Sequence, residues 1–165
     1  MEERRLVWRV ARHWIEIAQS GRLPRRDEID LHVLGEDWAN CLLIAVHSPI
    51  ERSHFITVGV NLAVALCPTD TLAGVLLSRL SRVVAARRGA IIEGGATLGG
   101  VGILYRSVLL PLSEDGATID HVLGATNYRS LRGEEEELTM QVTSETHWLD
   151  AVPSSTNGAA AHQRL

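Results

Sequence analysis

The sequence contains no lysine, since all 16 of its basic residues are arginine. Chemistry that requires a lysine amine, such as a pyridoxal Schiff base or the phosphate contact of a P-loop, is therefore excluded. The formal net charge is -4, so the chain lacks the overall positive charge that drives most nucleic-acid binding. The remaining route to nucleic acid is a local arginine patch, which would comprise Arg25, Arg26, Arg79, Arg82, Arg87 and Arg88.

Cysteine is also scarce, and its spacing suggests no chemistry. Cys41 and Cys67 form no C-x-x-C motif, so we expect two buried free thiols rather than a disulfide or a zinc site. The seven histidines show no H-E-x-x-H or similarly tight spacing, and neither G-x-S-x-G nor G-x-G-x-x-G occurs. The sequence thus predicts no metal, no cofactor and no catalytic residues.

Long apolar runs are absent as well. The first residues are charged and lead into an amphipathic segment, and no run approaches the roughly 20 apolar residues that span a membrane. We therefore expect a cytoplasmic protein that does not contact membranes.

Two segments have the periodicity of amphipathic helices. Arg4–Gln19 has apolar residues at positions 7, 10, 14 and 17 and again at 8, 11, 15 and 18. Leu72–Arg88 keeps the same spacing and is followed by Gly89, a typical residue just beyond a helix end. Between them, the proline-containing segment Leu23–Asp30 predicts an ordered connection or a solvated linker.

Strand-like runs make up most of the remaining chain. Asn40–Val46 and His54–Val60 predict a first pair, and Ala90–Leu98 a third strand. The stretch Gly102–Arg129 reads as a closing hairpin. Its first run is so evenly apolar that part of it should be covered on both faces, Pro111 is expected to end the ladder, and a Ser-Glu-Asp-Gly turn follows.

This order of elements predicts an α+β protein with a five-stranded antiparallel sheet, helices on one face and an N-terminal amphipathic helix. The predicted organisation is an N-terminal helix in residues 1–22, a domain in 23–133 and an acidic, disordered tail in 134–165. The run Glu134–Glu137 is typical of a solvated face or a boundary, and the chain from about Val152 has the composition of a disordered segment.

Three stretches give the chain a resemblance to the PAS domain, and in particular to a bacterial family of single PAS domains. They are His13-Trp14 through the Pro-Arg-Arg-Asp-Glu-Ile-Asp connection, the segment Arg106–Gly116, and the strand Asp120–Arg129. Two departures are Leu31, where the family usually has proline, and Cys67-Pro68-Thr69, where it usually has a glycine-bearing turn. The resemblance implies a sheet in PAS order, the long helix lying across it, and a sensory or interaction role in signalling with a protein partner.

The same resemblance places a possible pocket for a small, apolar metabolite between the long helix and the sheet. Apolar positions of the helix would line it, with a few polar strand residues for ligand contact. The predicted lining residues are Leu76, Leu80, Val83, Arg106, His121 and Asn127. The alternatives are that His121 is a core histidine, that Arg106 and Asn127 serve the sheet edges or pair with Asp120, and that the protein is a small-molecule enzyme.

The first helix also predicts a homodimer. Its two apolar stripes together cover about half the circumference, whereas one sheet buries only one of them. The predicted interface is the second stripe, with Trp8, Ala11, Ile15 and Ala18. The alternative is that the connection Leu23–Trp38 folds back over this stripe within one chain.

Overall fold

A computed structural model gives the structure of residues 3–18, 21–131 and 145–149. These residues form an α+β fold around one antiparallel sheet, whose strands lie in the order β2-β1-β5-β4-β3-β6. Its strands are β1 (Cys41–Ala45), β2 (His54–Val58), β3 (Ala90–Leu98), β4 (Val101–Leu112), β5 (His121–Ser130) and β6 (Glu145–Trp148). Its helical elements are α1 (Glu3–Ala18), η1 (Arg26–Glu28), α2 (Leu31–Leu34), η2 (Gly35–Asn40), η3 (Ile50–Arg52), α3 (Val60–Ala63), α4 (Leu72–Ser78) and α5 (Leu80–Ala86).

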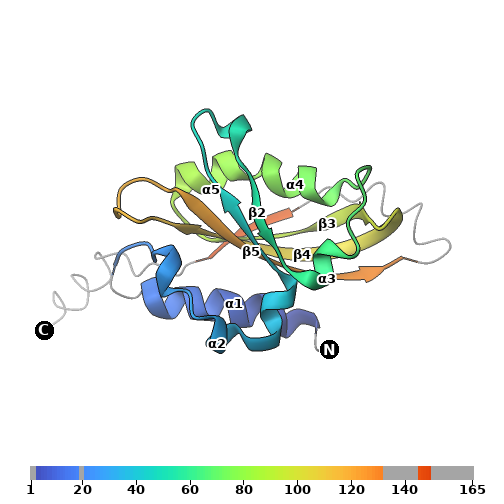
Figure 1. Cartoon of the computed structure of the whole chain (residues 1–165), viewed down its shortest axis with the longest axis horizontal. Helices are drawn as coiled ribbons and strands as arrows, with labels where there is room; N and C mark the ends of the chain where they lie inside the picture. The colour runs from blue at the N-terminus through green and yellow to red at the C-terminus, as the bar shows by residue number, and fades with distance from the viewer. Residues whose placement is uncertain (1–2, 19–20, 132–144, 150–165) are drawn as a thin grey trace, which may run out of the picture.

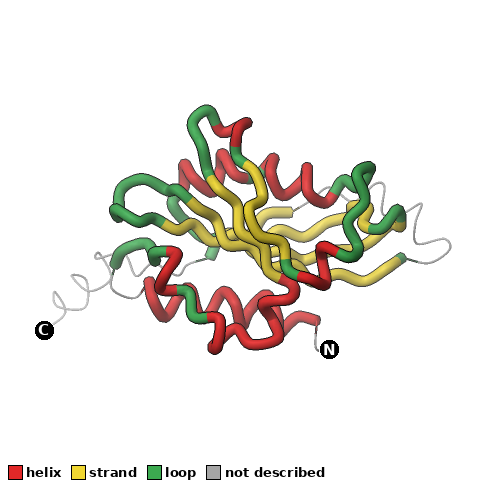
Figure 2. Tube along the Cα trace, in the orientation of Figure 1, coloured by secondary structure: helices red, strands yellow, loops and turns green. Residues whose placement is uncertain are grey.

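Helices cover both faces of the sheet, so the expectation of helices on one face is wrong. Figure 1 shows α4 and α5 on one side and α1 and α2 on the other, and Figure 2 shows the strands as one layer between them. The physical reason lies in the central strands, where Val108 to Leu112 of β4 are all buried. Side chains of consecutive strand residues point to opposite faces, so such a run requires cover on both.

The sheet has six strands rather than five. The sixth, β6, pairs antiparallel with β3, with Ala90 opposite Trp148 and Glu93 opposite Glu145. It lies within residues 134–165, which we predicted to be an acidic segment and disordered tail. Its sequence Glu-Thr-His-Trp lacks the apolar run that indicates a strand, since only Thr146 and Trp148 are half-buried. Backbone pairing with β3 defines the strand instead. The acidic run 134–137 and the chain beyond residue 149 lie outside the described residues.

Pro111 does not end the ladder, because β4 continues through it to Leu112 and pairs with β5. The strand tolerates proline because β3, on the other side, begins at Ala90 opposite Leu109 and no longer runs beside Pro111. The carbonyl of Pro111 accepts a hydrogen bond from the indole Nε1 of Trp14 in α1, at 2.9 Å. The first helix thus takes the place of a missing strand partner.

The predicted long helix is divided into α4 and α5. At the division, the Ser78 hydroxyl donates to the carbonyl of Val75 and the amide of Arg79 donates to that of Leu76. Both bonds reach back three residues, which tightens the turn and interrupts the helix. The left-handed residue after α5 is Arg87, with φ of 53°, and not the expected Gly89.

The first helix buries more of its surface than predicted. Ala11 and Ala18 of the second stripe are fully buried, Ile15 is half-buried, and Trp8 remains about half exposed. The segment after the helix bonds to α1 at positions outside the stripe: Arg9 forms a bidentate ion pair with Asp37 of η2, and the imidazole Nε2 of His13 accepts the amide of Asp30. The connection therefore packs against α1 within one chain, and of the four predicted interface residues Trp8 keeps the most exposed surface. Dimerisation through this helix stays a prediction.

Candidate functional site

The space between α4–α5 and the sheet, where the resemblance implies a possible pocket, is filled by the protein's own side chains. Leu76, Leu80 and Val83 are almost completely buried there. Beside Leu76 lies a cavity of about 20 Å³, which is entirely apolar in its lining. Its lining residues are Leu42, Phe55, Val58, Leu62, Leu66, Leu72, Ala73 and Leu76. A ligand pocket is typically about 300–1,000 Å³, so this cavity does not accommodate a metabolite.

The structure does not bring the polar candidates to that space. Leu42 lines a cavity together with Leu76 of α4, and a side chain at Gly124, opposite Leu42, would collide with it. Position 124 of β5 therefore faces α4 and α5, and side chains alternate between the two faces from there. By this alternation Asn127 and His121 point to the opposite face, which α1 covers. Arg106 lies opposite Asn127 in β4 and shares that face.

On that face the polar candidates belong to two separate places. Arg106 forms an ion pair with Glu93 beside a hollow of about 290 Å³, which Trp8 also lines. His121 lies at the other end of β5, where its Nδ1 is 2.7 Å from a carboxylate oxygen of Asp120. The six predicted ligand residues therefore form no common site.

The turn between β4 and β5 is the best-defined polar feature of the described chain. The hydroxyl of the buried Ser113 donates to the Thr118 carbonyl at 2.6 Å. One carboxylate oxygen of Asp115 accepts the amides of Thr118 and Ala117, and these bonds, with a contact from the Ser113 hydroxyl, lower the pKa of Asp115 to about 2. Asp120 accepts the amide of Glu114 at 2.9 Å. The turn is thus held by its own side chains.

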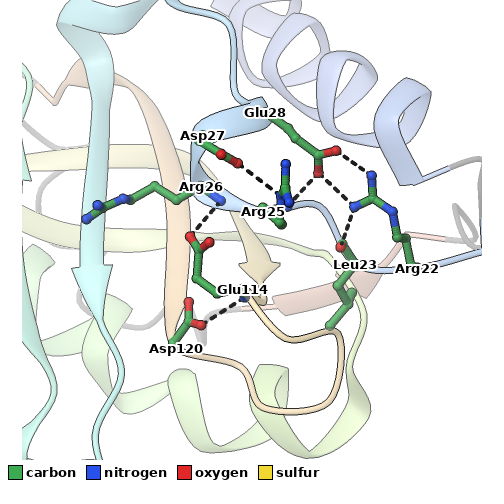
Figure 3. Close-up of polar contacts among 8 residues, drawn as sticks. All are labelled: Arg22, Leu23, Arg25, Arg26, Asp27, Glu28, Glu114 and Asp120. Carbon is green, nitrogen blue, oxygen red and sulfur yellow. Dashed lines mark hydrogen bonds and ion pairs between the residues drawn. The ribbon is translucent and has the colours of Figure 1, made fainter.

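The connection before η1 carries a second polar cluster (Figure 3). The guanidinium of Arg22 forms a bidentate ion pair with Glu28, and the amide of Arg25 donates to the same carboxylate at 2.8 Å. The ion pair first, and then the amide, lower the pKa of Glu28 to about 2. Asp27 lies 3.1 Å from Nε of Arg25. This segment is therefore an ordered connection and not a solvated linker.

The connection and the turn are bonded to each other although they lie some 90 residues apart in the chain. The amide of Ser113 donates to the carbonyl of Pro24 at 2.9 Å. The amide of Arg26 lies 3.4 Å from a carboxylate oxygen of Glu114. In Figure 3 the guanidinium of Arg26 points away from the drawn carboxylates. We refer to the two segments, 22–28 and 113–120, as the linker–turn cluster.

The turn is also held from the α5 side. The guanidinium of Arg87 donates to the carbonyls of Gly116, at 2.9 Å, and of Ala117. Beside this contact lies an open groove of about 450 Å³ between the turn, the end of α5 and the loop that joins β1 to β2. Val46, His47, Ser48, Ile50, Val84, Arg87, Ala117, Thr118 and Ile119 line it. The sequence did not predict this groove, because its lining comes from three segments that are far apart in the chain. The sequence indicates the turn residues but not which other segments lie beside them.

Nothing in the described residues indicates a metal centre, since no three His, Cys, Asp or Glu side chains gather there. Cys41 is buried as predicted, and burial first, with the nearby Asp37 charge, raises the pKa of its thiol to about 12. Cys67 is exposed, contrary to the prediction, because it lies in the loop before α4. Among the same described residues, no helix has the length and apolar content needed to cross a membrane.

Comparison with known proteins gives no assignment. No protein-family model matches the chain, and no curated protein or solved structure matches it either.

Proposed function

We propose that the chain is a regulatory module of the PAS type that acts by binding a protein partner. The observation that carries the proposal is the direct bonding of the stretches in which the resemblance lies. Trp14 bonds to Pro111, and the carbonyl of Pro24 accepts the amide of Ser113. The stretches that carry the resemblance are distant in sequence, and these bonds hold them together in the fold. The strand order β2-β1-β5-β4-β3, with α4 and α5 across one face, also supports the proposal.

The filled space between the helices and the sheet favours a protein partner over a metabolite. Leu76 and Leu80 occupy the position that the ligand would need, and the cavity left beside them holds about 20 Å³. A signal carried by a bound small molecule would require α4 and the sheet to separate. Surface contacts require no such rearrangement.

The β4–β5 turn is the surface that we expect the partner to contact. Residues 114–118 are exposed, and yet the segment is held by the carboxylate of Asp115, by Arg87 just after α5, and by the contact of Glu114 with the connection. An exposed segment that is already ordered loses little conformational entropy on binding. The turn is also bonded both to Arg87, just after α5, and to the segment after α1, so it links elements that lie on the two faces of the sheet.

The alternative of an enzyme on an α+β sheet rests on Asp120 and His121. The Asp120 carboxylate orients the imidazole, as an acid–base pair requires. A nucleophile would have to bond to the other ring nitrogen, and in the described part of the chain the imidazole of His121 has a hydrogen bond to Asp120 alone. The regulatory reading therefore accounts for more of the structure.

The proposal is tested by photo-crosslinking in the protein's native cells. A photoreactive residue at Thr118, on the turn, should give one predominant protein adduct, whereas the same residue at Ser81, on the exposed side of α5, should not. Arg87→Ala, which releases the turn from α5, should reduce the adduct while leaving the fold intact by circular dichroism. Adducts of equal yield and identity at both positions, or none at either, would contradict the proposal.

A further inference from the structure

The two edges of the sheet differ in how well they are protected against pairing with another strand. At one edge, the exposed side chains of β6 are Glu145 and His147, which lie 3.6 Å apart. Charged side chains are among the usual devices that keep an edge strand from pairing. At the other edge, β2 has the sequence His-Phe-Ile-Thr-Val, without an acidic residue, an arginine or a proline.

The outer backbone edge of β2 is open in the described chain. β1 pairs with its inner side, from Leu42 opposite Val58 to Ala45 opposite His54. No strand or loop of the described residues bonds to the other side. Figure 1 shows β2 with no helix or strand drawn in front of it. Such a row of unpaired amides and carbonyls is a template for another strand.

Exposed apolar side chains gather in the same part of the sequence. Of the seven large apolar side chains that are exposed in the described chain, three lie between residues 56 and 64. Ile56 of β2 is 43% exposed, and Val60 and Val64 are 61% and 80% exposed. The amide of Val64 donates to the carbonyl of Val60, so these two lie one helical turn apart on the same side of α3. The open edge thus continues into an apolar surface.

We propose that β2 pairs antiparallel with β2 of a second copy of this chain, about a two-fold axis, with Val60 and Val64 beside the new strand pair. Antiparallel pairing of identical strands is isologous and closes at two copies. Pairing of β2 with β6 of another copy would be heterologous and would place β2 against the Glu145 and His147 edge. Because the strand lacks acidic residues and arginine, two copies meet without placing like charges opposite each other at neutral pH.

One feature of β2 limits this pairing to a short segment. Relative to β1, the strand has one extra residue at Ile56, since Thr57 pairs with Leu43 and Phe55 with Ile44. Such a bulge increases the local twist of an edge. The contact therefore needs the apolar side chains of α3 in addition to the backbone bonds, and we expect a dimer that dissociates on dilution. The inference does not depend on the PAS-type function.

The test is the mass of the full chain in solution from low to high micromolar concentration, by sedimentation equilibrium. The wild type should reach twice the chain mass. Ile56→Lys should raise the dissociation constant at least about tenfold, because the axis brings both new charges together. Val101→Lys is the matched control, since Val101 is also 43% exposed but lies at the far end of β4, and it should leave the dimer unchanged. Trp8→Glu should leave it unchanged too.

A wild type that stays monomeric throughout, or a dimer that Ile56→Lys does not weaken, would overturn the proposal. If Ile56→Lys fails to fold, hydrogen exchange of the wild type decides. The amides of Phe55 and Val58 should become more protected as protein concentration rises, and concentration-independent exchange would overturn self-pairing. Protection that appears only when another protein's extended peptide is added would overturn it as well, and would assign the edge to that peptide.

Discussion

Replacing Trp14 with phenylalanine tests the contact between the first helix and the β4–β5 hairpin. Trp14 is completely buried, and its indole donates to the carbonyl of Pro111, which no strand bonds on that side. Phenylalanine keeps most of the apolar ring but leaves that buried carbonyl without a donor, which costs about 1–3 kcal/mol. The smaller ring adds roughly 1 kcal/mol for lost packing.

The expected loss is therefore about 2–4 kcal/mol out of the roughly 5–15 kcal/mol typical of a domain, so the variant should still fold. In urea, with a denaturant slope of about 2 kcal/mol per molar, the unfolding midpoint should fall by about 1–2 M. Circular dichroism is the assay, since it does not depend on tryptophan fluorescence. Trp8→Phe in the same helix is the control, because Trp8 is half exposed. A Trp14→Phe loss below about 0.5 kcal/mol, or one equal to the control, would refute the reasoning.

Three further expectations follow from the same structure. An added methyl group at Gly59 would lie 2.4 Å from the backbone carbonyl oxygen of Ala39, so Gly59→Ala should lower the free energy of unfolding by at least about 2 kcal/mol in the same urea assay. Gly74 lies in a helix with open space around it, so Gly74→Ala should instead raise that free energy by about 0.5–1 kcal/mol. In the native protein a thiol reagent at pH 8 should modify Cys67 rapidly and Cys41 only after unfolding, because burial raises the pKa of Cys41 to about 12; equal rates would contradict the buried position. The pKa of Glu28 is lowered from 4.5 to about 2, so the ionised carboxylate stabilises the fold above pH 4.5, and this stabilisation is lost as the pH falls toward 2. The free energy of unfolding of the wild type should therefore decline more over that interval than that of Glu28→Gln. Parallel curves for the two proteins would contradict the ion pair.

Much of the sheet was predictable from sequence because its signals are local. The third strand begins and ends where its apolar run does, at Ala90 and Leu98, and the Ser-Glu-Asp-Gly turn separates β4 from β5 as expected. Apolar runs and turn residues act over a few neighbouring positions, so one sequence suffices to read them. The strand β6 lacks that signal, because its four residues are held mainly by backbone pairing with β3.

The candidate site was less predictable because it depends on register. Arg106 and Ser107 are adjacent, but only one of them faces α4 and α5, and a shift of one residue exchanges the two faces. The predicted pocket mixed residues from both faces for this reason. The linker–turn cluster depends instead on contacts between distant segments, such as the Ser113 amide and the Pro24 carbonyl, which no spacing within either segment indicates.

The central claim is that this protein acts through its surface, because its own side chains fill the space under α4 and α5. Native mass spectrometry of the freshly purified full chain tests this claim most directly. Leu76, Leu80 and Val83 occupy that space and leave a cavity of about 20 Å³. We predict species that contain protein alone, both as first purified and after mild activation in the gas phase. A small molecule retained in stoichiometric amount, and lost on Leu76→Trp substitution within the cavity, would contradict the claim.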